Sequence, residues 1–410
     1  MPNVVVFDDG KGMLGPLTDL RSAMFVRTGA MTTLERLSQF GFSSFGRGVC
    51  GIFVPRELEA LERETSELPV NDAAVFGMSP REMVTRAATP VGAAGKKGST
   101  KKKGPAARAG KVGGKAGSKA GFPGADAPGV VLMNGRCVVA PEGVAKLVRD
   151  EALVTAGGDV IAAWLSAEGA REFVADGDGG RQGESALPRG VKRVACDEQC
   201  LLDRPWDVIR FRDRAIDIDL AILTQRPMQA LPDGVIGIDP EKIWIHPEAT
   251  VYPGVTLDAE QGVIAIEEGA VVRPGAVIIG PAYIGERSTV IDRTLIKGHT
   301  AIGPVCKVAG EVGGTIFQSF SNKAHDGHLG DSYVGEWVNF GAGTTNSNLL
   351  NTYGEVIAVA GPGERNERTG LQYLGCIVGD HVKFTICTRI MTGSVFGTGC
   401  MFAATAPPPT

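Results

Sequence analysis

A six-residue repeat fills the second half of the chain, and it constrains the fold more than any other feature of the sequence. From Ile243 onward an aliphatic residue recurs six positions after the last, with small residues or Gly between, apart from local insertions. Such a period cannot be the stripe of an α-helix. It is typical of a β-solenoid, in which each repeat forms one short side of a triangular coil. The aliphatic residue is expected to point inward, and Gly or Asn to form the corner. The repeats start at Ile245, Val251, Ile266, Val272, Ile278, Ile284, Ile296 and Ile302.

These repeats resemble the hexapeptide-repeat family, whose fold is a left-handed parallel β-helix, an exception to the usual right-handed crossover. The resemblance implies a left-handed β-helix domain over residues 240–410, with repeats running to about Gly399. Coils of this family usually form trimers. The resemblance therefore also implies a homotrimer assembled through the β-helix, with sites between neighbouring subunits.

The first half of the chain has a different pattern, in which apolar runs of strand length alternate with helical segments. The run VVVF at 4–7 predicts a buried parallel strand, GIFVP at 51–55 a second strand, and RELEALERETS at 56–66 an amphipathic helix. A further strand runs into a turn at Asn134-Gly135-Arg136. This alternation predicts an α/β sheet domain over residues 1–230.

A low-complexity segment rich in Gly, Ala and Lys interrupts this domain at about 91–129. It has almost nothing to bury, so we expect a disordered insert. The segment from Lys96 to Lys119 holds nine basic residues and no acidic one, which leaves 33 basic against 46 acidic residues in the rest of the chain. An acidic body disfavours nucleic acid as a partner.

The chain carries no signal for a membrane or for an oxidising compartment. Its start has no basic region followed by a long apolar run, and no stretch reaches the roughly 18 apolar residues of a membrane span. Its eight cysteines are scattered, which fits reduced thiols. Cys196 and Cys200 form a single CDEQC pair without a second pair or a nearby His, so no zinc site is expected there. We interpret the protein as cytoplasmic.

Several polar residues of the first half suit a nucleotide or phosphate. Asp8 and Asp9 follow a buried strand, and the loops at the carboxyl ends of such strands are where α/β sheets bind ligands. Two arginines and a Gly lie near a helix start at Thr32 or Thr33, an arrangement that suits an anion. Solvated or salt-bridged arginines are the alternative. The candidate residues are Asp8, Asp9, Arg21, Arg27, Gly29, Asn134, Arg136 and Asp207.

The stretch SNKAHDGHLGDSYVGEWVNFGAGTTNSN at 321–348 carries the strongest functional signal. It resembles the acetyltransferase half of the GlmU family, bifunctional enzymes that acetylate glucosamine-1-phosphate and uridylylate the product. In that family a catalytic His lies in a K-A-G-H segment ahead of L-G-D and G-A-G-T. Here Lys323-Ala324-His325, Leu329-Gly330-Asp331 and Gly341-Ala342-Gly343-Thr344 keep the spacing.

The resemblance assigns roles residue by residue. It implies that His325 is the catalytic base, that Asn339 contacts the sugar, and that Asn348 corresponds to the Asn of an N-Y pair. The family's Tyr three residues after the base is His328 here. Its substrate-binding Arg has no match, because the chain has Lys307-Val308-Ala309-Gly310 at that place. Lys307 and Lys323 are the alternative phosphate ligands.

The first half resembles a divergent group of GlmU-like sugar nucleotidyltransferases through FDD, PLTDLR, VRTGAMTTLERL and NGR. The signature L-x-x-G-x-G-T-R-M of the nucleotidyltransferases is missing, so no residue is carried over from it. The resemblance implies nucleotidyl transfer from an NTP, with Mg²⁺, to a sugar-1-phosphate.

The implied acetyl transfer from acetyl-CoA to an amino sugar needs an unprotonated amine. An imidazole can take the proton of the attacking amine, and His325 would do so. Backbone N–H groups of the coil would stabilise the oxyanion, and Asn339 would orient the sugar. Together the two halves imply synthesis of a nucleotide sugar of the UDP-N-acetylglucosamine type.

Four other interpretations remain open. The first is a trimeric zinc hydrolyase with His299, His325 and His328 as ligands. The second is a nucleotidyltransferase whose solenoid only assembles the oligomer. The third is a non-catalytic sensor of sugar nucleotides that binds near Asp8 and Arg21. In the fourth, the two histidines at 325 and 328 are merely polar residues on a solenoid face.

Overall fold

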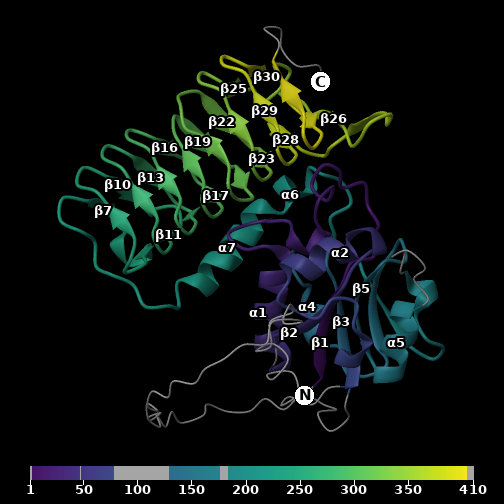
Figure 1. Ribbon diagram of the computed structural model, residues 1–410. Helices are drawn as coiled ribbons and strands as arrows, with labels where there is room; N and C mark the ends of the chain where they lie inside the picture. The colour runs from purple at the N-terminus through teal and green to yellow at the C-terminus, as the bar shows by residue number, and fades with distance from the viewer. Residues whose placement is uncertain (1, 47, 78–128, 176–182, 404–410) are drawn as a thin grey trace, which may run out of the picture.

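The computed structural model describes residues 2–46, 48–77, 129–175 and 183–403. Figure 1 shows an α/β unit followed by a long solenoid, with the helices α6 and α7 between them. The insert expected at 91–129 lies outside the described residues, apart from Gly129. Within the described ranges, no helix has the length and apolar character needed to cross a bilayer.

A six-stranded mixed sheet forms the core of the α/β unit, in the order β2-β1-β3-β5-β4-β6. Strands β2, β1 and β3 are parallel, β5 is antiparallel to β3 and β4, and β6 is parallel to β4. The α/β prediction is confirmed. The strands are β1 (Asn3–Phe7), β2 (Val49–Phe53), β3 (Val130–Asn134), β4 (Glu151–Thr155), β5 (Val160–Leu165) and β6 (Lys192–Cys196).

Helix α1 begins with a capping box, because Thr32 Oγ1 accepts the Glu35 N–H at 3.3 Å and Glu35 Oε2 accepts the Thr32 N–H at 2.7 Å. The sequence had left Thr32 and Thr33 open as the cap. The α-helices are α1 (Thr33–Phe45), α2 (Arg56–Thr65), α4 (Glu142–Ala145), α5 (Ala167–Ala175), α6 (Asp207–Arg210) and α7 (Arg212–Leu223). The 3₁₀ segments are η1 (Ala23–Phe25), η2 (Ala73–Gly77), η3 (Glu184–Ala186) and η4 (Pro240–Lys242).

The solenoid has three parallel faces, which the chain visits in turn, and the predicted left-handed β-helix is confirmed. The first face holds β7 (Ile236–Ile238), β10 (Thr256–Asp258), β13 (Val277–Ile279), β16 (Leu295–Ile296), β19 (Glu311–Gly313) and β22 (His328–Gly330). The second holds β8 (Ile243–Ile245), β11 (Ile264–Ile266), β14 (Ala282–Ile284), β17 (Thr300–Ile302), β20 (Ile316–Phe317), β23 (Tyr333–Val334), β28 (Cys376–Val378) and β31 (Ser394–Phe396). The third holds β9 (Thr250–Val251), β12 (Val271–Val272), β15 (Thr289–Val290), β18 (Lys307–Val308), β21 (Asn322–Lys323), β24 (Asn339–Phe340), β29 (Lys383–Phe384) and β32 (Met401–Phe402).

Two smaller pairs complete the described strands. β25 (Thr345–Asn346) pairs in parallel with β30 (Arg389–Ile390), and β26 (Ile357–Val359) pairs with β27 (Asn366–Arg368) in an antiparallel hairpin. The hairpin projects from the coil stack near its C-terminal end (Figure 1).

The repeat aliphatics form the solenoid core, as predicted: Val272, Ile278 and Ile284 are fully buried in one cluster that runs along the coil axis. The corners differ from the expectation of Gly or Asn. Arg287, Val305 and Trp337 all have positive φ there. This conformation costs an L-residue roughly 1–2 kcal/mol. It is held because corner N–H groups bond the preceding coil; that of Val305, for example, donates to the Glu286 carbonyl at 2.9 Å.

Glycine is required where one coil crosses close to the next. A Cβ on Gly285 would lie 2.7 Å from both the Ile302 carbonyl oxygen and the Gly303 carbonyl carbon. We expect Gly285→Ala to lower the free energy of unfolding by about 1–3 kcal/mol, because backbone atoms of the next coil would have to move. Urea denaturation would measure it. Gly397→Ala is the matched control, since Gly397 follows β31 as Gly285 follows β14 and has no atom within 4 Å of its Cβ position. Equal losses in the two variants would contradict this explanation.

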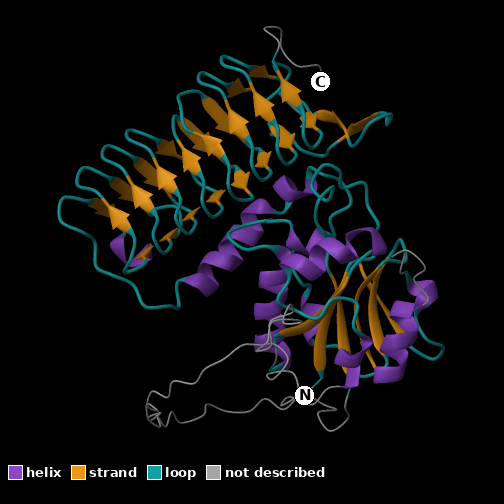
Figure 2. Cartoon of the chain, in the orientation of Figure 1, coloured by secondary structure: helices purple, strands orange, loops and turns teal. Residues whose placement is uncertain are grey.

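The second face of the solenoid is covered by the α/β unit. The outward side chains Trp244, Tyr283 and Tyr333 are buried in a cluster that also contains Trp206 and Leu220 from the α6–α7 region. Figure 2 shows these helices lying along the solenoid, between it and the mixed sheet. The first and third faces carry the exposed polar residues considered next.

Candidate functional site

His325 lies in an exposed loop at a corner of the solenoid, between β21 on the third face and β22 on the first. The loop rests on neighbouring coils: a Cβ on Gly310 would lie 2.6 Å from the Gly327 carbonyl oxygen, so Gly310 leaves room for the loop. His325 therefore lies in a loop packed closely on the preceding coil, and it is exposed to solvent.

Lys323 lies beneath this loop and donates hydrogen bonds to its backbone. Its side chain is 2% exposed, and its Nζ donates to the carbonyl oxygens of Ala309 at 3.1 Å, His325 at 3.0 Å and Asp326 at 3.4 Å. Burial lowers the pKa of Lys323 to about 8, and the charge of Asp326 opposes this only in part. The ammonium predicted to bind phosphate thus lies under the loop that carries the candidate base.

The lowered pKa of Lys323 gives a stability change with a defined sign. Between about 8 and its ordinary value of 10.5, the unfolded chain binds a proton that the folded chain lacks. The free energy of unfolding of the wild type should therefore rise with pH over this window, by up to about 3 kcal/mol relative to Lys323→Met. Denaturant titrations from pH 7 to 10.5 measure this difference. Lys307→Met, which removes an exposed ammonium, should give no such trend, and a difference independent of pH would contradict the prediction.

Two further candidates lie in one column on the third face. Lys307 is in register with Asn322, and Asn322 with Asn339, so these three exposed residues follow one another on successive coils. Lys383 is next in the column. The column offers amide groups for hydroxyls and ammonium groups for an anion beside the His325 loop.

On the other side of the corner, His328 lies on the first face, and Asn348 follows β25, which lies beside β22. His328 Nδ1 is 3.4 Å from Glu311 Oε1. A Cβ on Gly330 would lie 2.6 Å from His328 Nε2 and 2.7 Å from Asn348 Nδ2, so the two side chains flank the same glycine. The loop of His325 thus separates two polar surfaces of one chain: His328 with Asn348, and Lys307 with Asn339.

Two residues of this region, Asp331 and Glu311, were not among the site residues predicted from the sequence. Asn348 Nδ2 donates to Asp331 Oδ2 at 2.7 Å, and Glu311 is paired with both His328 and Lys297. The bond with Lys297 lowers the pKa of Glu311. The L-G-D motif, of which Asp331 is the last residue, could have indicated Asp331 from the sequence. Glu311 belongs to no motif that could have indicated it.

In the α/β unit, Asp9, Asn134 and Arg136 form a closed network. Arg136 is fully buried; its Nε and Nη2 each donate to Asp9 at 2.7 Å, and Nη1 donates to Asp203 at 2.5 Å. Asn134 donates to Asp9 Oδ2 at 2.8 Å. Burial alone would lower the pKa of the guanidinium, but the interactions with Asp9, Asp159 and Asp203 together outweigh burial and raise that pKa. These side chains are satisfied by one another, unlike the open phosphate ligands expected from the sequence.

Asp8 and Asp9 do not fit Mg²⁺ in this structure. Asp8 accepts the Gly10 N–H, the Ser22 hydroxyl and the Ala23 N–H, so both of its oxygens are used. Asp9 is taken up by the Arg136 network. Among the described residues, no group of three or more His, Cys, Asp or Glu side chains is placed to hold a metal ion. The carboxylate oxygens of Asp8 and Asp9 are thus engaged by groups of the chain itself.

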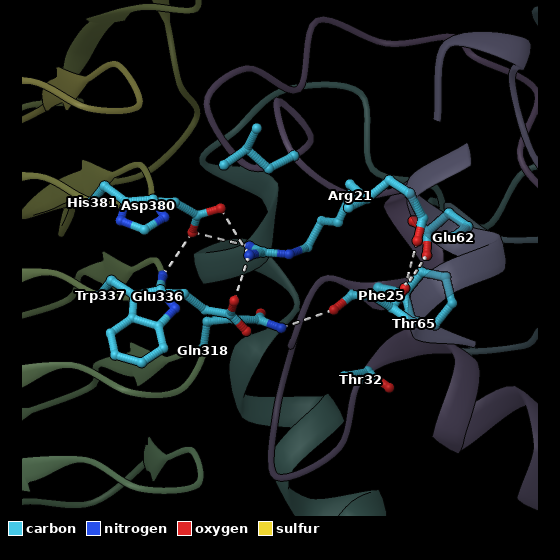
Figure 3. Close-up of a pocket in the computed structure, with 12 residues that line it drawn as sticks. Arg21, Phe25, Thr32, Glu62, Thr65, Gln318, Glu336, Trp337, Asp380 and His381 are labelled. Atoms are coloured by element: carbon cyan, nitrogen blue, oxygen red, sulfur yellow. Dashed lines mark hydrogen bonds and ion pairs between the residues drawn. The ribbon is translucent and has the colours of Figure 1, made fainter. Parts of the chain in front are cut away.

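Arg21 crosses from the α/β unit to the solenoid (Figure 3). Its Nη2 lies 2.8 Å from Asp380 Oδ2 and 3.2 Å from Glu336 Oε2. It lines a pocket of about 420 Å³ between the two units, whose lining also includes Glu62, and burial raises the pKa of Glu62. The guanidinium is neutralised by two carboxylates, which corresponds to the salt-bridged alternative rather than to a phosphate site.

The remaining candidates of the α/β unit also have partners within the chain. The Arg27 Nε donates to the Gln318 carbonyl at 3.1 Å. Gly29 packs against α7, where a Cβ would lie 2.5 Å from Asp219 Oδ2. Asp207 is 3% exposed and accepts the Arg204 N–H at 2.8 Å. All three lie in or beside the contact between the two units.

The zinc interpretation requires His299 to meet His325 and His328. His299 lies at the corner between β16 and β17, on the first and second faces, whereas His325 lies at the corner between the third and first faces. Within one chain these histidines are thus on different corners.

Comparisons with known proteins match part of this chain to GlmU. It is 28% identical over 139 residues to the bifunctional protein GlmU of Rippkaea orientalis, which covers 29% of this chain and 30% of that protein. It is 34% identical over 140 residues to a bifunctional sugar-1-phosphate nucleotidylyltransferase/acetyltransferase of Sulfurisphaera tokodaii, covering 33% and 34%. Up to about a third of the chain is therefore similar to these bifunctional proteins.

The chain spans about a third of the length of these two relatives. A longer match, 24% identical over 253 residues, to GlmU of Ralstonia nicotianae covers 55% of this chain and 53% of that protein. No family model matches the sequence. The acetyltransferase domain of PglB from Neisseria gonorrhoeae aligns over 64% of this chain and all of that domain, at 14% identity and a TM-score of 0.19.

Proposed function

We propose that this protein transfers an acetyl group from acetyl-CoA to the amine of an amino-sugar phosphate at the corner that carries His325. The observation that carries the proposal is the placement of an exposed His325 between two polar surfaces, inside the segment with GlmU-like spacing. The acetyltransferase in the name of the Sulfurisphaera tokodaii relative supports the same reaction.

In this mechanism the His325 imidazole takes a proton from the substrate amine as its nitrogen attacks the thioester carbon. The C–N bond forms and the C–S bond breaks, and the imidazolium returns its proton to the leaving thiolate of CoA. Asn339 orients sugar hydroxyls, and Lys307 in the same column attracts the phosphate. The oxyanion needs N–H donors, which the coil backbone supplies.

We further propose that three copies assemble through the β-helix. The column of Lys307 and Asn339 and the pair of His328 and Asn348 lie on opposite sides of the His325 corner of one chain. A neighbouring subunit packed beside the His325 corner would bring a column and a pair together around one substrate.

The test incubates the protein with acetyl-CoA and one of three acceptors: glucosamine-1-phosphate, glucosamine-6-phosphate or glucosamine. Release of the free thiol of CoA is measured for each acceptor. Turnover of an amino-sugar phosphate is the expected result. Absence of thiol release with every acceptor, from a folded protein whose oligomeric state has been measured, would overturn the proposal.

Nucleotidyl transfer by the α/β unit is a second candidate, favoured by the mixed α/β sheet and by the nucleotidylyltransferase named for one relative. It would complete synthesis of a sugar nucleotide of the UDP-N-acetylglucosamine type. Pyrophosphate release from UTP or dTTP with a sugar-1-phosphate, with and without Mg²⁺, tests it. Acetylation without pyrophosphate release would leave the acetyltransferase alone, and the reverse result would make the solenoid an assembly element.

A further inference from the structure

Arg212, the first residue of α7, reaches from the α/β side of the molecule to the solenoid. Its side chain is 12% exposed. Its Nη1 donates to the Gly314 carbonyl at 2.6 Å and to Asp331 Oδ1 at 2.7 Å, while Nε donates to Asp213 at 2.7 Å. Charge-assisted bonds of this kind fix the position of the carboxylate they hold.

Asp331 connects Arg212 to Asn348 in the candidate site. One of its oxygens is held by Arg212, and the other accepts the Asn348 Nδ2–H at 2.7 Å. Because an ionised carboxylate only accepts hydrogen bonds, the Asn348 amide must present its nitrogen to Asp331. Its oxygen is therefore turned away from Asp331, as an acceptor for a substrate group.

Two glycines leave room for this chain of contacts. A Cβ on Gly314 would lie 2.5 Å from Arg212 Nη1 and 2.6 Å from Asp331 Oδ1. A Cβ on Gly330 would meet Asn348 and His328 at similarly short distances. Gly314, on the preceding coil, thus leaves room for Arg212, and Gly330, next to Asp331, leaves room for both Asn348 and His328.

We propose that Arg212 is a positioning residue for acetyl transfer: the α/β unit holds Asp331, and Asp331 orients Asn348 so that its amide oxygen accepts an N–H or O–H group of the substrate. The inference rests on the proposed function of this corner. It means that the solenoid alone does not contain the complete site, and that the two units are coupled through α7.

The experiment compares Arg212→Met with Arg214→Met in the full-length protein. Arg214 lies on the same helix but pairs with Glu198 at the surface. We expect Arg212→Met to lower kcat/KM for acetylation by about tenfold to a hundredfold, as for loss of a charge-assisted bond, and Arg214→Met to leave it within twofold. Arg212→Lys should recover only part of the loss, because a lysine lacks the planar fork.

A double variant separates positioning from a general effect on folding. In the Asn348→Ala background, Arg212→Met should change kcat/KM by less than about twofold, because the group that it positions is gone. Losses that multiply would overturn the proposal.

A second measurement does not depend on turnover. Amide hydrogen exchange over residues 345–350 should be faster in Arg212→Met than in the wild type, and unchanged in Arg214→Met. Equal exchange in all three proteins would overturn positioning by Arg212. Wild-type protein without acetylation, but with this exchange difference, would overturn the proposed function and leave the positioning contact standing.

Discussion

Replacing His325 with alanine is expected to lower kcat for acetyl transfer by about 10²–10⁴-fold, the usual contribution of a general base. KM should change little, because the imidazole acts on the proton that leaves during attack rather than on the bound sugar. The free energy of unfolding should stay within about 0.5 kcal/mol of the wild type, since the side chain is exposed. Steady-state thiol release and a denaturant titration measure the two quantities.

His299→Ala is the matched control for this variant. His299 also sits at a corner of the solenoid, with a φ of 54°, but at the corner between the first and second faces. It should retain kcat within twofold. Acetylation that survives His325→Ala would remove His325 from the mechanism, and equal losses in both variants would point to a change in the coils instead.

Replacing Arg136 with methionine is expected to lower the free energy of unfolding by about 3–5 kcal/mol, the largest stability loss that we predict. The change leaves the Asp9 carboxylate fully buried without the two bonds that neutralise it, and it also frees the Leu202 carbonyl, which Arg136 Nη1 holds at 2.9 Å. Methionine fills much of the volume of the arginine side chain. The loss of stability would therefore reflect the unpaired Asp9 carboxylate rather than a cavity.

Arg149→Met provides the comparison for this loss. Arg149 is 40% exposed and lies 3.8 Å from Asp150, a surface pair worth about 0–1 kcal/mol. If Asp9 is the reason for the loss, the double variant Arg136→Met with Asp9→Asn should be more stable than Arg136→Met alone, because it removes the stranded charge. A double variant less stable than either single variant would contradict this explanation.

The α/β candidates show why residue type in the sequence does not settle a role. Arg21 and Arg27 were expected near phosphate because two arginines and a glycine lie near a helix start, and Arg136 was a candidate in the turn after a strand. In the structure the guanidinium of Arg21 is paired with Asp380, 359 positions along the chain, and Arg136 with Asp9, 127 positions away. A carboxylate that far along the chain leaves no trace in the local pattern.

The solenoid candidates followed the sequence more closely, because a coil places neighbours in the sequence at defined places on its three faces. In the sequence His325 lies three residues before His328. In the structure both remain at the same corner, with His325 in the loop and His328 at the start of β22. The burial of Lys323 was not foreseeable, since it depends on carbonyl groups of the preceding coil such as that of Ala309.

The sequence by itself determined the local architecture: a period of six specifies inward aliphatic residues such as Val272 and Ile278, and alternating strands and helices specify the α/β unit. Tertiary structure decided the rest. Apolar side chains on the outer surface of one face, such as Trp244 and Tyr283, indicate that something covers them but not what does. Only the fold shows that α6 and α7 do so, and that Arg212 thereby meets Asp331. The physical reason is separation along the chain. A pattern of buried residues repeats every few positions and can be recognised in a short stretch of sequence. The two side chains of an ion pair can come from any two positions, and only the fold brings them together.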